Sequence, residues 1–273
     1  MSLRLFPCLS FLLVALLSVK TNANGSLVIL YDGVRVTTQP PLEDVVPADI
    51  RYLRFKYALG AEDIFATIPD SEFAVIAKFP NIEALSVDAR TEPLTAQTIR
   101  TIANCTNLKA LWLVDAVICY DAIPILLKIP VYALELKGIP LSERLQFLDT
   151  QKLRSLTLTH CGLHNEDASL IANTPQLRYL DVSDNEYLDG DFVFRLGTRE
   201  RLEDLYLDNV ELSVAECRLI PSKFPRLQYM TGKTTEKGEE LLESALDDFE
   251  LTPYDGRRNP LSGLEEIWEA KEE

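Results

Sequence analysis

The sequence predicts an α/β solenoid, in which parallel strands line one face and helices cover the other. A short frame with leucine-type residues at offsets one, four and six recurs along the chain, as in LRYLDVSDNEYL from Leu177 and LRSLTLTHCGL from Leu153. Successive frames from Ile82 begin 22 to 26 residues apart. A unit of this length cannot bury its apolar face alone, so the repeats must stack on one another.

Other copies of the frame are LEDLYLDNVEL, LKALWLVDAVI and VYALELKGIPL, with weaker ones at Ile50, Ile82 and Leu227. The pattern resembles the leucine-rich-repeat family, whose strand signature has Asn or Cys at the ninth offset. Cys161 and Asn185 fill that offset here, and the resemblance implies that their side chains bond buried backbone in the loop. Four other frames have Arg90, Ala116, Ile139 and Val210 there, so we expect an irregular ladder. The resemblance implies an α/β horseshoe and says little about function.

Residues 1–23 resemble a secretory signal peptide. An apolar run from Leu9 to Val19 precedes Thr21 and Ala23, whose small side chains have the spacing of a cleavage site. The run is shorter than the roughly 20 residues that span a bilayer, although an uncleaved anchor is the alternative. No later stretch is apolar enough to span a membrane.

Residues 24–76 are expected to form an N-terminal cap over the first repeat. SLVILYDG is typical of a strand that ends in a turn, and TTQPPLEDVVPAD of a proline-rich connection. Repeats then occupy residues 77–232. Between the frames, the expected helix N-caps are Thr95, Ser142, Asn165 and Ser213.

Residues 233–273 form an acidic, partly helical C-terminal tail or cap. The whole chain has a formal net charge of −15, and loss of Arg4 and Lys20 with the signal peptide would make it −17. From Thr234 onward there are 13 acidic and 4 basic side chains. Such a chain repels nucleic acid and anionic membranes. Apolar residues at helical spacing predict a helix over the last repeat: Leu241, Leu242, Ala245, Leu246 and Phe249.

We find no residues that predict catalysis, a metal or a cofactor. MTGKTT at 230–235 ends like a phosphate-binding loop but lacks the upstream glycine that the motif requires. His160, Cys161 and His164 are soft ligands, yet Cys161 should point inward, and no fourth zinc ligand is evident. We expect the cysteines to be mostly buried thiols.

Function is therefore sought on the concave face, where strand alternation places offsets three, five and seven. Tyrosine, tryptophan and aspartate gather there, and the aromatic types dominate binding hot spots. The predicted binding residues are Trp112, Tyr179, Asp181, Asp204, Tyr206, Asp208 and Tyr229.

The sequence predicts an exported, non-enzymatic binding module, located outside the cell or in the periplasm or cell envelope. Its acidic and aromatic face would bind a protein or peptide, possibly a basic one. One alternative is a carbohydrate- or cell-wall-binding protein, because tyrosine platforms with aspartate acceptors also suit sugars. A second is an intracellular adaptor or substrate receptor, which requires that residues 1–23 are not a signal; no F-box-like helical segment precedes the repeats.

Export is tested by N-terminal sequencing of the native protein. We expect the mature chain to begin near Asn24, since Thr21 and Ala23 fit signal peptidase specificity. Recovery of Met1 or Ser2 on a soluble cytosolic chain would contradict the signal-peptide prediction.

Overall fold

The computed structural model describes residues 26–31, 36–39, 47–57, 67–141, 143–245 and 250–251. The chain divides after Asp149 into two compact units, and each is treated by itself below. The predicted signal peptide, residues 1–23, lies outside the described residues.

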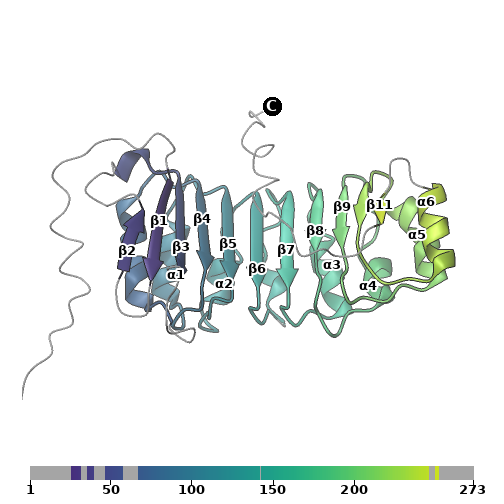
Figure 1. The fold of residues 1–273 in the computed structure, drawn as a ribbon, viewed down its shortest axis with the longest axis horizontal. Coiled ribbons are helices and arrows are strands. Elements are labelled where there is room, and N and C mark those ends of the chain that lie inside the picture. Colours follow the sequence, from purple (N-terminus) through teal and green to yellow (C-terminus); the bar gives the residue numbers. More distant parts are fainter. Residues whose placement is uncertain are drawn as a thin grey trace, which may run out of the picture. The chain divides into compact units, whose positions relative to one another are not determined.

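The first unit contains a sheet whose strands follow in order of sequence except at one edge (Figure 1). Its strands are β1 (Ser26–Tyr31), β2 (Val36–Gln39), β3 (Tyr52–Tyr57), β4 (Ala84–Asp88), β5 (Ala110–Val114) and β6 (Ala133–Lys137). Parallel pairing runs from β1 through β3, β4 and β5 to β6. Strand β2 pairs antiparallel with β1 at the edge. The expected strand at SLVILY is therefore confirmed, whereas Thr37–Gln39, expected in a connection, belong to β2.

The helical segments of the first unit are short. They are the 3-10 helices η2 (Pro47–Asp49), η3 (Asp70–Lys78) and η4 (Leu145–Phe147) and the α-helices α1 (Ala96–Ala103) and α2 (Ile123–Leu126). Thr95 caps α1 as expected, because its hydroxyl accepts a hydrogen bond from the Thr98 N–H at 3.3 Å. Ser142 lies outside the described residues. Helix η3 crosses the expected boundary at residue 76, and that boundary stays a prediction.

The second unit has a parallel sheet formed by β7 (Ser155–Thr159), β8 (Tyr179–Asp181), β9 (Asp204–Tyr206), β10 (Tyr229–Met230) and β11 (Glu250–Leu251). The third residue of each leucine frame stands beside the third residue of the next: Ser155, Tyr179, Asp204 and Tyr229. Equivalent positions of the sequence frames therefore pair with one another across adjacent strands. Strand β11 follows no leucine frame, and the sequence did not predict it.

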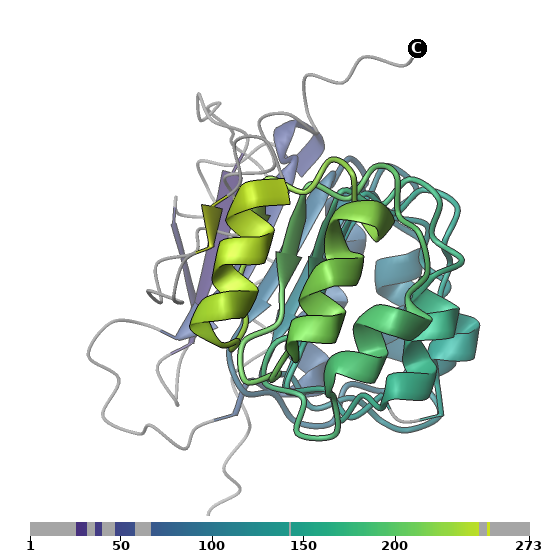
Figure 2. The ribbon, with the colours of Figure 1, turned by 90° about the vertical axis from the view of Figure 1, so that its right-hand side faces the viewer.

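Helices of the second unit lie on one side of its strands, where α5 and α6 run side by side (Figure 2). They are η5 (Asn165–Asp167), α3 (Ala168–Ile171), α4 (Gly190–Arg195), α5 (Val214–Lys223) and α6 (Glu236–Ala245). Ser213 caps α5 in a capping box with Glu216. Asn165 was expected as an N-cap, but His164 occupies that position.

Helix α6 confirms a helix in the tail, and its Leu242 is fully buried. Leu246 and Phe249 lie outside the described residues. Gly238 allows α6 to approach α5 closely, since a Cβ there would stand 3.0 Å from the Cys217 sulfur and still nearer the Thr234 hydroxyl.

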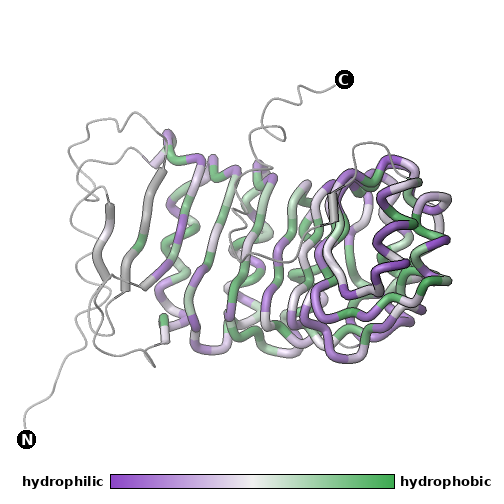
Figure 3. The backbone as a smooth tube through the Cα atoms, turned by 45° about the vertical axis from the view of Figure 1, so that its right-hand side comes forward, coloured by the Kyte–Doolittle hydropathy of each residue, from purple (hydrophilic) through white to green (hydrophobic). Residues whose placement is uncertain are grey.

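The core of each unit consists of the leucine-type residues of the frames. Those at offsets one, four and six are at most 6% exposed in every frame from Ile50 to Leu227, apart from the half-buried Gly232 at offset six of the last one. Hydrophobic and hydrophilic residues therefore alternate along the repeats (Figure 3). Burial of such side chains stabilises by about 1.5–3 kcal/mol each, so stacking is what makes these short repeats stable.

Asn185 joins two neighbouring repeats from within the core. Its amide nitrogen donates to the carbonyl oxygens of Leu158 at 2.7 Å and Val182 at 2.8 Å, and its oxygen accepts from the N–H groups of Cys161 at 2.9 Å and Leu163 at 3.1 Å. The inward position expected for Asn185 is confirmed. Cys161 is fully buried as expected, while Cys105 and Cys119 are partly exposed.

A left-handed residue ends the strand segment in consecutive repeats. Offset eight has φ of 55° at Asp115, 71° at Gly138, 57° at His160, 60° at Asp184 and 68° at Asn209. Glycine, asparagine, aspartate and histidine are the residues that tolerate this conformation. This corner reverses the strand alternation, so offset nine points inward instead of toward the open face.

Replacing Asn185 with alanine should lower the free energy of unfolding by about 1–3 kcal/mol, because buried backbone groups lose their partners. Asn185→Asp should be no better tolerated, since a buried carboxylate adds a desolvation cost and cannot donate to the Leu158 carbonyl. Urea denaturation measures both, with the exposed neighbour Glu186→Ala as control. Wild-type midpoints for both variants would contradict the bridging role.

Substitutions at His160 test whether offset eight requires a left-handed residue. His160→Gly should match or exceed wild-type stability, whereas His160→Val should cost about 1–2 kcal/mol, because a β-branched residue fits a positive φ poorly. Thermal unfolding of both variants decides this. Equal melting temperatures would mean that the corner does not require a left-handed residue.

Candidate functional site

Six predicted binding residues gather on one sheet face of the second unit. We call this set the Tyr/Asp face: Tyr179, Asp181, Asp204, Tyr206, Asp208 and Tyr229. Their neighbours Leu180, Leu205 and Met230 are fully buried on the other side of the strands, as alternation requires. Asp181 lies in register beside Tyr206, and Asp204 lies between Tyr179 and Tyr229. Tyrosines and aspartates thus alternate along and across the strands.

The three tyrosine rings form a continuous row. Ring centroids are 5.0 Å apart between Tyr179 and Tyr206 and 5.1 Å apart between Tyr206 and Tyr229, with tilts of 41° and 43°. These spacings match the preferred range for aromatic pairs, and each such pair adds about 0.5–1.5 kcal/mol beyond burial. Mutual packing therefore holds the rings before any ligand arrives, which reduces the entropy lost on binding.

The aspartates are held by short polar contacts. Asp181 is 4% exposed, and its Oδ1 accepts the Ser183 N–H at 3.0 Å. The Ser183 hydroxyl donates to Asp208 Oδ2 at 3.3 Å and accepts the Asp208 N–H at 3.0 Å. Ser183 therefore links Asp181 and Asp208 and fixes the direction of both side chains. The sequence had placed Asp181 in solvent, and the structure shows it buried instead.

Two threonines near this face depart from the sequence expectation. Thr159, at offset seven, is 8% exposed, and its hydroxyl has no hydrogen-bond partner among the described residues. A buried hydroxyl without a partner costs free energy that a bound polar group would recover. Thr231, at offset five, is fully buried and accepts the Leu207 N–H at 3.1 Å, because β10 ends at Met230 and alternation stops there.

Trp112 belongs to the first unit and is 5% exposed, so its expected solvent exposure is wrong. Its registered neighbour on β4 is the small Ser86, and the Tyr52 ring meets the indole edge-on with centroids 6.3 Å apart. Burial raises the pKa of Tyr52, with Arg54 acting in the opposite direction. Arg54 also pairs with Asp88 at 2.6 Å. This face of the first unit is packed and internally paired.

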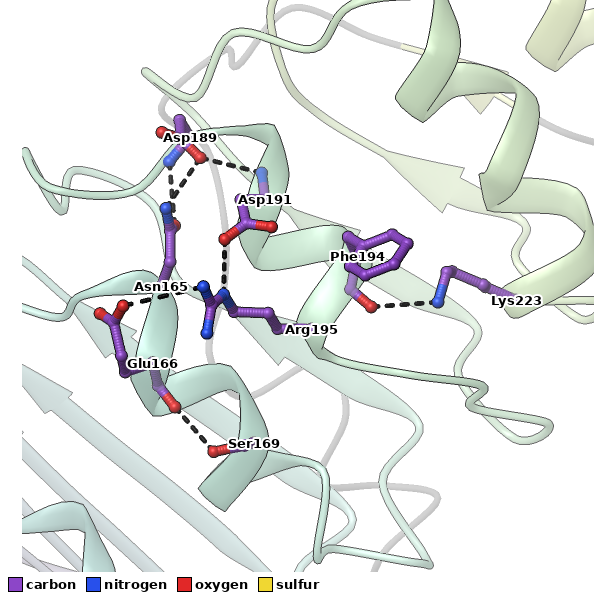
Figure 4. A network of polar contacts seen from close by, with 8 residues as sticks. All are labelled: Asn165, Glu166, Ser169, Asp189, Asp191, Phe194, Arg195 and Lys223. Carbon is purple, nitrogen blue, oxygen red and sulfur yellow. Dashed lines mark hydrogen bonds and ion pairs between the residues drawn. The ribbon is translucent and has the colours of Figure 1, made fainter.

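A polar network lies among the helices of the second unit (Figure 4). Asn165 donates to Asp189 at 2.8 Å, and Asp189 caps α4 by accepting the Asp191 N–H. Arg195 pairs with Asp191 at 2.5 Å and with Glu166 at 3.9 Å. Exposed ion pairs contribute little to stability, about 0–1 kcal/mol. The network ties neighbouring repeats together and resembles no catalytic arrangement.

The histidines do not assemble a metal site. The His164 ring stacks on Tyr187 with centroids 4.6 Å apart. Burial raises the pKa of the neighbouring Asp167, whose carboxylate accepts a hydrogen bond from the backbone N–H of His164. Within the part of the chain that the structure describes, no group of three or more His, Cys, Asp or Glu could hold a metal ion. Nor is any helix of that part long and apolar enough to cross a bilayer.

No protein-family model and no curated protein matches this chain. Solved structures with a similar fold include a Bacteroides fragilis protein, with 14% identity, a TM-score of 0.43 and coverage of 70% of this chain and 71% of the other. An internalin from Listeria monocytogenes has 15% identity, a TM-score of 0.47 and coverage of 78% and 65%. Yeast Rad7, in its complex with Elc1, has 13% identity, a TM-score of 0.40 and coverage of 76% and 69%.

The registered frames, the buried leucines and the Asn185 bridge have the arrangement that the resemblance to leucine-rich repeats implies. At such low identities the solved structures transfer no activity or partner, so function has to be inferred from the residues of the chain itself.

Proposed function

We propose that this chain is a protein-binding module whose Tyr/Asp face holds a basic peptide segment of its partner. The observation that supports this most directly is the row of three tyrosine rings interleaved with three aspartates. Such a surface combines contact area with a defined charge preference.

Arginine and lysine side chains suit both components of the face. A cation over a tyrosine ring gains about 0.5–1 kcal/mol when exposed and about 2 kcal/mol when desolvated. A carboxylate beside the ring adds a charge-assisted hydrogen bond, and arginine can make two such bonds at once. From β7 to β9, offsets three, five and seven carry Asp181, Asp204 and Asp208 and no basic side chain. A basic ligand would therefore meet attraction over β7 to β9, while Lys233 at offset seven of the last repeat, which donates to Asn209 at 3.1 Å, bounds this region on the side of β10.

The proposed setting is extracellular or within the cell envelope, supported by the signal-like residues 1–23. A sugar ligand is the less favoured candidate, because the rings tilt by 41° and 43° against one another and offer no shared flat platform. An intracellular adaptor would use the same face, so its chemistry does not depend on location.

Tyr206 lies at the centre of the ring row, and its removal tests the proposal. Tyr206→Ala should weaken binding of a fluorescent peptide of alternating arginine and glycine by about 2 kcal/mol, roughly thirtyfold. Asp208→Asn should weaken binding less, and the loss should shrink as salt rises from about 0.1 M to 1 M, where the Debye length falls to about 3 Å. Fluorescence anisotropy measures both.

Two controls make the result specific. Tyr187→Ala removes an exposed tyrosine away from the face and should bind the peptide like wild type. Glu239→Gln, Glu240→Gln and Glu243→Gln together remove three exposed charges from α6 and should also leave affinity unchanged. Equal binding by Tyr206→Ala and wild type would place the peptide elsewhere, and salt-independent binding of an oligosaccharide would favour the sugar hypothesis.

A further inference from the structure

We infer that the first occupant of the Tyr/Asp face is the chain's own C-terminal segment, through the adjacent pair Arg257 and Arg258. This inference rests on the proposed function, because it assumes that the face binds basic side chains. It adds that the partner must displace an internal competitor.

The described chain leads directly to this face. Strand β11 pairs in parallel with β10, which puts Glu250 beside Tyr229 and Leu251 beside Met230. Parallel strands share one direction, so the chain leaves Leu251 at the same edge of the sheet where Asp208 follows β9. The described chain thus ends beside the ring row, at the edge of the sheet where Asp208 lies.

The reach of the following residues matches the distances to be covered. Adjacent strands lie about 4.8 Å apart, so Asp208 is about 10 Å and Asp181 about 14 Å across the sheet from β11. Arg257 is the sixth residue after Leu251, and an extended chain covers up to about 20 Å in that length. The arginine pair can therefore reach all three aspartates without disturbing β11.

Charge singles out this segment within an acidic tail. Between residues 252 and 264 the charged side chains are Asp255, Arg257 and Arg258, so this stretch is net positive. The flanking residues include Glu236, Glu239, Glu240 and Glu243 before it and Glu265, Glu266 and Glu269 after it. Acidic flanks would be repelled by the Tyr/Asp face, which leaves the arginine pair as the complementary element.

A tethered ligand competes strongly even when its intrinsic affinity is weak. A short flexible connection gives an effective concentration on the order of 1 mM. If the isolated segment binds with a dissociation constant on the order of 0.1 mM, the tether makes a free peptide appear about tenfold weaker than it is. A partner must then supply more contacts than the segment does.

The test uses the full chain and a fluorescent peptide with the sequence of residues 252–264. Arg257→Ser with Arg258→Ser should increase affinity for this peptide about tenfold relative to the unmodified chain, because the internal competitor is lost. Adding Tyr206→Ala should abolish the gain. The matched control Lys237→Ser with Lys271→Ser removes two positive charges elsewhere and should bind like the unmodified chain.

Equal affinity of the unmodified and Arg257→Ser, Arg258→Ser chains would overturn the inference, as would the same gain in the lysine control or its persistence with Tyr206→Ala. The arginine-glycine peptide separates the two proposals. If it binds in a Tyr206-dependent manner with an affinity that the arginine substitutions do not change, internal competition is wrong and the proposed function stands. If neither peptide binds any of these chains, both are wrong.

Discussion

The structure depends on a single constraint: no repeat of this chain can bury its leucines without a neighbour. The frame residues at offsets one, four and six are at most 6% exposed in every repeat up to that of Leu202, yet each strand is only a few residues long. A short strand and a one-turn helix are unstable alone in water. The second unit therefore ends its sheet with β11 and covers α5 with α6, which shields the last apolar surface.

Stacking also demands that every repeat turn its chain at the same point. The left-handed residues at Asp115, Gly138, His160, Asp184 and Asn209 provide that corner. They turn offset nine inward, where Asn185 satisfies backbone groups of its own repeat and of the preceding one. Where Ala116, Ile139 or Val210 occupies this offset, the side chain is buried as an apolar contact instead. The ladder is irregular, as the sequence predicts, because these repeats fill offset nine with a packed apolar side chain instead of a hydrogen-bonding asparagine.

Periodic features could be predicted from the sequence, and features that depend on neighbouring strands could not. The leucine frames, the caps at Thr95 and Ser213 and the inward Asn185 follow from local spacing. The corner also had a signal, since turn-favouring residues recur at offset eight, but the alternation rule alone does not reveal it. Burial of Trp112 depends on the side chains that neighbouring strands bring beside it, which are Ser86 and Tyr52. Strand β11 forms only because β10 offers an edge, and its two residues carry no pattern of their own.

The offsets of the three tyrosines explain why aromatic rings and carboxylates occur together on one face. Tyr179 and Tyr229 occupy offset three, whereas Tyr206 occupies offset five of the repeat between them. Rings at one offset would sit about 4.8 Å apart and face each other directly, an arrangement less favourable than an offset or tilted one. The shift by two residues lets the rings tilt by 41° and 43°. The shift also leaves offset three of the middle repeat and offset five of the repeat before it without a tyrosine. Asp204 and Asp181 occupy these two positions. The same displacement that packs the tyrosines therefore puts a carboxylate next to each ring, which favours a cationic side chain over a neutral one.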